Sequence, residues 1–178
     1  MLSYLKQVSL GRGGWFLLLL SCLVFEGVGL YFQHVMKLEP CVMCIYERAA
    51  IAGVAFSALI ALIAPRMLLL RLLAVAIGLF SAVKGLRLAL QHTDYQLNPA
   101  PWNQCPLMVE FPSTLPLNKW LPQMFEAYGS CSEIQWSFLG FSMPQWLIVI
   151  FVSYILVLGL VLISQFKPMQ RRQRNLFK

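Results

Sequence analysis

The residues best suited to chemistry in this chain are two cysteines three positions apart, Cys41 and Cys44, in the stretch P-C-V-M-C-I-Y-E-R at 40–48. Two thiols at this spacing can close a small ring, so the pair can cycle between a dithiol and a disulfide. The same spacing also occurs in half of a zinc site, and it can arise by chance. The surrounding sequence has to decide between these interpretations.

The positions around the pair favour redox chemistry. Pro40 is expected to end the preceding segment, and Val42 begins the predicted first turn of a helix. A thiolate at a helix N-terminus is stabilised by the positive end of the helix dipole. Arg48 lies four residues after Cys44 and therefore on the same helix face, where its charge can stabilise a thiolate or an anion formed beside it.

The composition indicates a membrane protein. Of the 178 residues, 59% are hydrophobic and 12% are charged, and the mean hydropathy is +0.69. A soluble domain of this length has too little interior to bury so much apolar side chain. The formal net charge of +7 does not predict nucleic-acid binding, because the basic residues gather at the ends of apolar runs. We find no Gly-rich phosphate loop and no H-x-x-x-H motif, and we expect no metal site.

The apolar runs predict an all-α membrane protein, a four-transmembrane-helix bundle in one domain over residues 1–178. The first run is interrupted only by Glu26, and it is long enough to cross a hydrocarbon core of about 30 Å. A secretory signal peptide fits this run poorly, because the run is too long and no A-x-A-like cleavage site follows it. The predicted spans cover about residues 13–32, 42–64, 67–90 and 144–164, with loops on one side at about 33–41 and 91–143.

The long loop at 91–143 is rich in proline, so it cannot be a continuous helix. One part of it nevertheless has helical periodicity and predicts a short interfacial amphipathic helix, lying on the lipid bilayer. Pro122 argues for a shortened or kinked helix, and packing of the apolar face on the protein itself is the alternative. The apolar positions of this helix are Leu117, Trp120, Leu121, Met124 and Phe125.

The distribution of charge predicts the orientation. The N-terminal head, the turn at 65–71 and the C-terminal tail together hold nine Lys or Arg and no acid, whereas the other side holds five basic and six acidic residues. The positive-inside rule therefore places both termini in the cytoplasm. Four cysteines then lie on the opposite side of the membrane, namely Cys41, Cys44, Cys105 and Cys131. In a bacterium this side is the periplasm, where disulfides persist.

The five cysteines differ in what they can do. Cys22 lies among leucines in the middle of the first span, where packing is its expected role. The other four allow three disulfide pairings, and a zinc site of four cysteines usually needs two closely spaced pairs. Two structural disulfides are a further alternative. A Cys41–Cys44 disulfide closes almost no chain and gains little stability from loop closure, which favours a redox couple.

Several motifs together resemble the disulfide bond formation protein B family. They are P-C-V-M-C-I-Y-E-R at 40–48, Q-H-T at 91–93, L-P-L-N-K-W-L-P-Q at 115–123 with a cysteine on either side, and M-P-Q-W-L at 143–147. The order of four spans agrees as well. The resemblance implies a protein-dithiol:quinone oxidoreductase of the bacterial inner membrane. Such enzymes reoxidise a periplasmic DsbA-like thiol oxidase and pass the electrons to ubiquinone or menaquinone, generating disulfides de novo.

The resemblance also implies a path for the electrons. Cys105 and Cys131 form the pair that meets the partner, and Cys41 and Cys44 form the pair that faces the quinone. A partner thiolate attacks Cys105, the released Cys131 attacks Cys41, and Cys44 becomes the thiolate that donates to the quinone.

Two further residues are expected to bind the quinone by the same resemblance. Arg48 is the residue associated with the quinone and with its developing negative charge. His92 falls near the same pocket, whereas His34 is a weaker candidate. Glu26 is expected to form a hydrogen bond within the bundle or to lie near the outer interface. Glu47 is expected to pair with a neighbouring base or to face headgroups.

Two alternatives remain open at this stage. A disulfide reductase would use the same residues in the opposite direction, but it would need an electron donor on the cytoplasmic side, where no cysteine is expected. A non-enzymatic four-helix scaffold, braced by its disulfides, would be indifferent to quinone.

Overall fold

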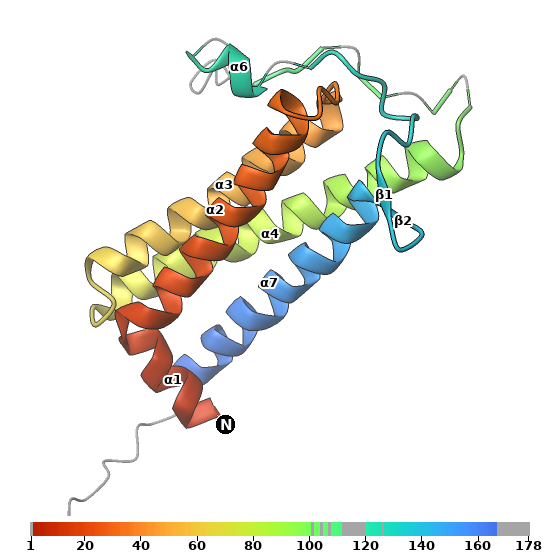
Figure 1. Ribbon diagram of the computed structural model, residues 1–178. Coiled ribbons are helices and arrows are strands. Elements are labelled where there is room, and N and C mark those ends of the chain that lie inside the picture. Colours follow the sequence, from red (N-terminus) through yellow and green to blue (C-terminus); the bar gives the residue numbers. More distant parts are fainter. Residues whose placement is uncertain are drawn as a thin grey trace, which may run out of the picture.

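The computed structural model describes residues 2–166 except 101, 104, 107, 112–119 and 126. The C-terminal tail and its basic residues, which enter the charge count, lie outside the described residues. Four long helices run side by side, and the chain between the last two of them passes over one end of the bundle (Figure 1). The elements are α1 (Leu2–Leu10), α2 (Arg12–His34), α3 (Val42–Ile63), α4 (Leu68–Leu97), α6 (Pro122–Phe125), β1 (Ser137–Phe138), β2 (Phe141–Ser142) and α7 (Met143–Gln165).

The predicted four-helix membrane fold is confirmed. By length and composition, α2, α3, α4 and α7 are each able to cross a membrane. Helix α4 continues to Leu97, beyond the predicted end of the third span at 90, and the irregular part of the long loop begins after it. No proline or glycine interrupts residues 91–97, and the first proline after them is Pro99. The Asn98 backbone N–H donates to the Asp94 carbonyl oxygen at 2.8 Å, which closes the last turn.

The N-terminal head forms a helix of its own, α1, which the sequence analysis treated only as a basic segment. This helix packs against α2 and α7. The Trp15 indole donates to the Ser9 carbonyl oxygen at 2.9 Å, and the Lys6 ammonium donates to the Gln165 carbonyl oxygen at 3.2 Å. These contacts fasten the beginning of the chain to the end of α7.

The core lies among the four long helices, since one buried cluster contains residues of α2, α3, α4 and α7. Small residues let the helices approach closely, as is usual in membranes. A Cβ atom at Gly85 of α4, for example, would collide with the Phe151 ring of α7. Cys22 is fully buried in this core, with its sulfur 3.5 Å from the Tyr154 hydroxyl, which confirms the expected packing role.

A short hairpin precedes α7, and the sequence analysis did not predict it. Ser137 pairs with Ser142 and Phe138 pairs with Phe141, leaving a two-residue turn. Both turn residues have positive φ, 53° at Leu139 and 82° at Gly140, as the favoured hairpin turns require. Leucine is an unusual residue for the first of these positions, which explains why the turn gave no clear signal.

The predicted surface helix is only partly within the described residues, since 117–119 lie outside them. Its described part is α6, which begins at Pro122, a helix position where the missing N–H of proline is tolerated. Phe125 is 4% exposed and packs edge-on against Phe111, with ring centroids 6.0 Å apart. Trp120 and Leu121 are exposed. The apolar residues of this segment are therefore divided between the protein and the surroundings.

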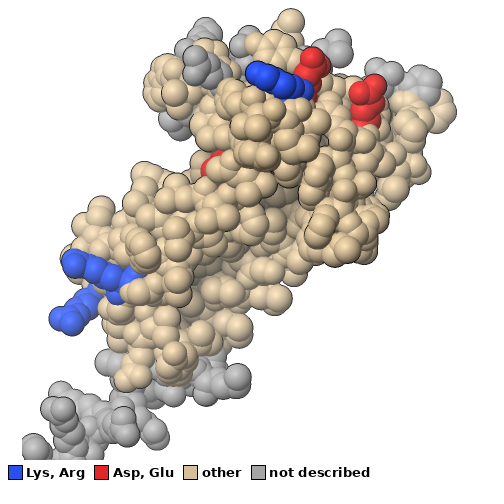
Figure 2. Space-filling model, in the orientation of Figure 1, with Lys and Arg blue, Asp and Glu red and all other residues tan. Residues whose placement is uncertain are grey.

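The charged side chains gather at the two ends of the bundle on the face seen in Figure 2. Basic side chains alone lie at one end, and both signs lie at the other, whereas almost all of the surface between them is uncharged. This distribution agrees with helices that cross a bilayer.

Candidate redox site

The inner cysteine pair lies where α3 begins, as the sequence predicted. Cys41 is the N-cap residue of α3, and its sulfur accepts from the Cys44 backbone N–H at 3.3 Å. The two sulfurs are 2.6 Å apart and are not bonded to each other. A disulfide bond measures about 2.03–2.05 Å, so little movement joins them. Cys41 is buried and Cys44 is half-buried, which leaves Cys44 as the more accessible member.

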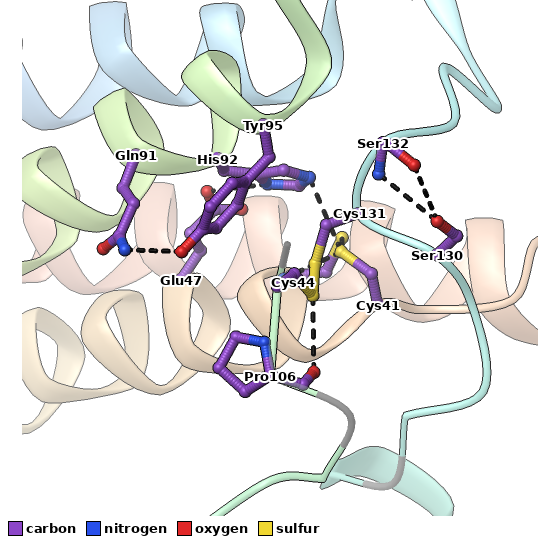
Figure 3. Close-up of a disulfide and its surroundings, with 11 residues drawn as sticks. Cys41, Cys44, Glu47, Gln91, His92, Tyr95, Pro106, Ser130, Cys131 and Ser132 are labelled. Carbon is purple, nitrogen blue, oxygen red and sulfur yellow. Dashed lines mark hydrogen bonds and ion pairs between the residues drawn. A yellow bond between two sulfur atoms is a disulfide. The ribbon is translucent and has the colours of Figure 1, made fainter. Parts of the chain in front are cut away.

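A buried histidine and glutamate extend this pair (Figure 3). His92, from α4, has its Nε2 3.5 Å from the Cys41 sulfur and its Nδ1 3.0 Å from Glu47 Oε1. The predicted pairing of Glu47 with a neighbouring base is thereby confirmed. Glu47 is completely buried, and among the described residues its other carboxylate oxygen has no hydrogen-bond partner.

Arg48 lies in a second buried polar group, between α3 and α2. Its Nε is 3.4 Å from Glu26 Oε2, and its Nη1 donates to Gln33 Oε1 at 2.8 Å. The expected hydrogen bond of Glu26 within the bundle is confirmed. Within the described part of the chain, Arg48 Nη2 is buried without a hydrogen-bond partner. The guanidinium is therefore anchored on one side, and one N–H group remains available to a ligand.

A cavity of about 440 Å³ adjoins both polar groups. Its polar lining includes Cys44, Arg48 and His92, which are three of the site residues predicted from the sequence. Its walls are mainly apolar and aromatic, from α2, α3, α7 and the segment before β1, and include Phe25, Phe32, Ile51, Trp136, Trp146 and Ile150. His34 is exposed at the end of α2 and is not part of this lining.

The cavity lies between α2 and α7, which have no extensive contact with each other among the described residues. They meet deeper in the bundle, where the Ser21 and Tyr154 hydroxyls are 3.1 Å apart. Toward the cysteine end, residues of both helices line the cavity instead. This arrangement leaves space between the two helices at that end of the bundle.

The outer pair is a disulfide between Cys105 and Cys131, with Cα atoms 6.0 Å apart. Cys131 is buried in one apolar cluster with Cys41, Met43 and Tyr95, and Cys105 packs against the same cluster. Figure 3 shows this disulfide beside the inner sulfurs. The structure therefore brings the two cysteine pairs into one contiguous group.

Backbone contacts hold the outer pair in this place. The Pro40 carbonyl oxygen accepts from the backbone N–H groups of Tyr128 at 2.9 Å and Gly129 at 3.1 Å. Cys41 and Gly129 form an isolated parallel bridge. A Cβ atom at Gly129 would collide with the Glu39 carbonyl oxygen, so only glycine allows this approach. Sequence analysis missed Gly129, since one glycine in an irregular segment has no distinctive signal.

A second cavity, of about 650 Å³, lies on the outer side of the disulfide. Its lining includes Cys105 and Cys131 and is more polar than that of the first cavity. The neighbouring side chains include Tyr95, Asn103, Ser130 and Ser132. The outer pair thus faces a polar cavity, and the inner pair faces an apolar one.

Comparison with known proteins agrees with this geometry. A family model described as disulfide bond formation protein DsbB matches residues 11–161. Disulfide bond formation protein B from Histophilus somni is 58% identical over 178 residues, covering all of both chains. The protein of that name from Mannheimia succiniciproducens is 55% identical over the same full length, and that from Haemophilus influenzae is 51% identical over 99% of each chain. The chain belongs to the DsbB family of disulfide bond formation proteins and is a multi-pass membrane protein.

Proposed function

We propose that this chain is a protein-dithiol:quinone oxidoreductase that reoxidises a periplasmic DsbA-like thiol oxidase and passes the electrons to ubiquinone or menaquinone. The observation that carries the proposal is the packing of the Cys105–Cys131 disulfide against the Cys41/Cys44 pair, which itself borders an apolar cavity with a buried arginine. This group links an outward-facing disulfide to a cavity suited to a lipid-soluble ligand.

The cavity residues fit a quinone. The aromatic and aliphatic walls match a flat ring, and the opening between α2 and α7 suits a prenyl tail that stays in lipid. Arg48 Nη2 is a buried donor in need of an acceptor, which a quinone oxygen supplies. A bound quinone would accept the two electrons released when Cys41 and Cys44 form their disulfide.

The cysteines exchange disulfides in four balanced steps. A thiolate of the reduced partner attacks Cys105, which is partly exposed, and forms a mixed disulfide as Cys131 leaves as a thiolate. Cys131 then attacks Cys41 of the oxidised inner pair and releases Cys44 as a thiolate beside the cavity. The partner's second thiol resolves the mixed disulfide and releases Cys105. Cys105 then attacks Cys131, which restores the outer disulfide and frees Cys41 beside Cys44. Arg48 stabilises negative charge at the cavity, a contribution that is large where water is excluded.

His92 is positioned to accept a proton from Cys41 in this exchange. Its Nε2 faces the Cys41 sulfur, and Glu47 stabilises the ring when Nε2 also carries a proton. Oxidation of a dithiol to a disulfide releases two protons, and a base close to the sulfur is needed to take one of them.

The direction of the reaction follows from the partner's strength as an oxidant. A DsbA-type oxidase has a potential of about −120 mV, so its electrons pass only to a stronger acceptor. A membrane quinone meets that requirement. The location proposed is the bacterial inner membrane, with both termini cytoplasmic and the redox cysteines periplasmic, as the charge count predicts.

Purified protein in quinone-containing nanodiscs, mixed with a reduced DsbA-like protein, tests the proposal. Quinone absorbance and free thiols are followed together, and one quinol is expected for each disulfide formed in the partner. A cysteine-free variant is the control. Oxidation of the partner at an unchanged rate without quinone would contradict the proposal.

A further inference from the structure

We propose that the reduced Cys41/Cys44 pair, together with His92, is a binding site for a thiolate-preferring divalent cation such as Zn²⁺, and that the bound ion keeps the pair reduced. This goes against the expectation from the sequence, which predicted no metal site. The proposed ligand atoms are the two sulfurs and His92 Nε2. The three residues can offer ligand atoms that lie within 4.8 Å of one another.

The spacing of these atoms suits tetrahedral coordination. With Zn–S bonds of about 2.3 Å and Zn–N bonds of about 2.0–2.1 Å, ligand atoms in a tetrahedral site stand about 3.5–3.8 Å apart. The distance from His92 Nε2 to the Cys41 sulfur is already 3.5 Å. The sulfurs, 2.6 Å apart, need to separate by about 1 Å. Rotation of the Cys44 side chain, which borders the cavity, provides that movement.

Glu47 is the second and independent observation that points to a metal. A carboxylate only accepts hydrogen bonds, so the contact of Glu47 Oε1 with His92 Nδ1 at 3.0 Å places the ring proton on Nδ1. The lone pair of Nε2 then points toward the sulfurs. A histidine that donates its second N–H to a carboxylate is the usual arrangement of metal-binding histidines.

The ligand set selects the class of cation. Two thiolates and an imidazole favour Zn²⁺ and similar borderline or soft ions, whereas Mg²⁺ and Ca²⁺ require oxygen ligands. The two thiolates neutralise the dication, which reduces the cost of burying it. The fourth coordination position faces the cavity, where a water molecule can occupy it.

Binding is restricted to the dithiol form. Two thiols lose two protons and one Zn²⁺ forms two Zn–S bonds, with no change in oxidation state. Both sulfurs are then bound to the ion, so they can neither form a disulfide nor release electrons. On the proposed function, the ion would therefore act as a reversible inhibitor of the reduced enzyme.

Cobalt titration tests the site without quinone or partner. Full-length protein with Cys105→Ala and Cys131→Ala is reduced, freed of reductant and titrated with Co²⁺ under anaerobic conditions. Thiolate-to-cobalt charge-transfer absorption and the visible bands of tetrahedral Co²⁺ should saturate at one ion per chain. Zn²⁺ should remove both signals. Absence of these bands, or equal binding by the oxidised protein, would overturn the proposal.

Variants assign the ligands in this background. Cys41→Ser or Cys44→Ser should abolish the charge-transfer absorption, and Glu47→Gln should weaken binding by roughly 10–100-fold, as loss of a metal-orienting partner typically does. His92→Ala should weaken it further, and Cys22→Ala, the matched control at a buried thiol, should leave it unchanged. Affinity unchanged in both Glu47→Gln and His92→Ala would refute the histidine ligand.

Inhibition is measured separately in the wild-type chain. Zn²⁺ should stop turnover with the reduced partner, and a chelator should restore it. Because the cobalt bands require no turnover, a negative titration leaves the proposed function standing, and an inactive enzyme leaves the metal site standing.

Discussion

The two cysteine pairs are held by different kinds of structure. Cys41 and Cys44 begin a regular transmembrane helix and have a histidine from another helix beside them. Cys105 and Cys131 lie in irregular segments, joined to the bundle by a few contacts. A helix fixes its side chains, whereas irregular backbone tolerates the movement of a disulfide that changes partners. The comparison indicates that the pair beside the apolar cavity needs a fixed geometry. The pair that is proposed to meet the partner needs freedom to move.

The largest expected effect comes from removing the Cys105 sulfur, which the partner thiolate is proposed to attack. Cys105→Ser should abolish oxidation of the partner, because no disulfide then faces the outer cavity. The inner pair should still become oxidised when quinone is supplied. Thiol trapping followed by gel electrophoresis measures both states, and a variant that still oxidised the partner at the normal rate would show that Cys105 is dispensable.

Removing the charge at the cavity should have the next largest effect. Arg48→Ala should slow quinone reduction by about 10²–10³-fold, because one electrostatic stabiliser in a water-excluded site is lost. Arg48→Lys should recover part of the rate, since the charge remains but the planar fork does not. Quinone absorbance decay at several quinone concentrations measures this.

Exchange between the outer pair and the partner should be unchanged in both Arg48 variants, which is the control for correct insertion. Superimposable decay curves for all three proteins would remove Arg48 from the quinone site.

A smaller effect is expected at Gly129, where the segment that carries the outer pair contacts the beginning of α3. Gly129→Ala introduces a Cβ that collides with the Glu39 carbonyl oxygen, so the segment must move away from Cys41. Overpacking of this kind costs about 1–3 kcal/mol, or roughly 5–150-fold in the rate of transfer from the outer to the inner pair. Stopped-flow thiol trapping measures the transfer. Gly27→Ala is the control, because its Cβ would meet nothing within 4 Å.

The smallest effect concerns the loop itself. Phe125→Leu removes the edge-on ring contact with Phe111 but keeps most of the buried apolar area, so the expected loss is about 0.5–1.5 kcal/mol, or roughly 2–10-fold in local opening. Limited proteolysis of the loop should accelerate by that factor. Trp120→Ala, at an exposed position, should leave cleavage unchanged. Equal cleavage of both variants would contradict the division of this segment between protein and surroundings.

Sequence reasoning succeeded where local spacing determines the outcome. The apolar runs predict the four helices, and the i, i+4 relation places Cys44 and Arg48 on one helix face. It failed where the answer depends on which helices meet. His92 contacts Glu47 across 45 positions, and Arg48 contacts Glu26 across 22, and no local pattern encodes either pair.

Some of the missed features nevertheless had a weak signal. The identity of the base that pairs with Glu47 was missed, although a buried acid at the beginning of an apolar helix, three residues after Cys44, requires a partner. The extension of α4 to Leu97 was recoverable from the absence of a helix breaker before Pro99. Helix α1 and the hairpin were harder to predict. The basic residues of the N-terminal head are also explained by the orientation of the protein in the membrane, and Leu139 is an unusual residue at a turn.

The opening proposed between α2 and α7 determines in which units the concentration of a ligand of the apolar cavity should be expressed. On the proposed function, a molecule that reaches the cavity between these helices arrives from lipid and never crosses the aqueous phase. Its concentration is then a mole fraction of the bilayer, which stays the same when a suspension of vesicles is diluted with buffer. Saturation should therefore follow the ratio of quinone to lipid and be independent of sample volume, whereas saturation by the water-soluble partner should follow its molarity.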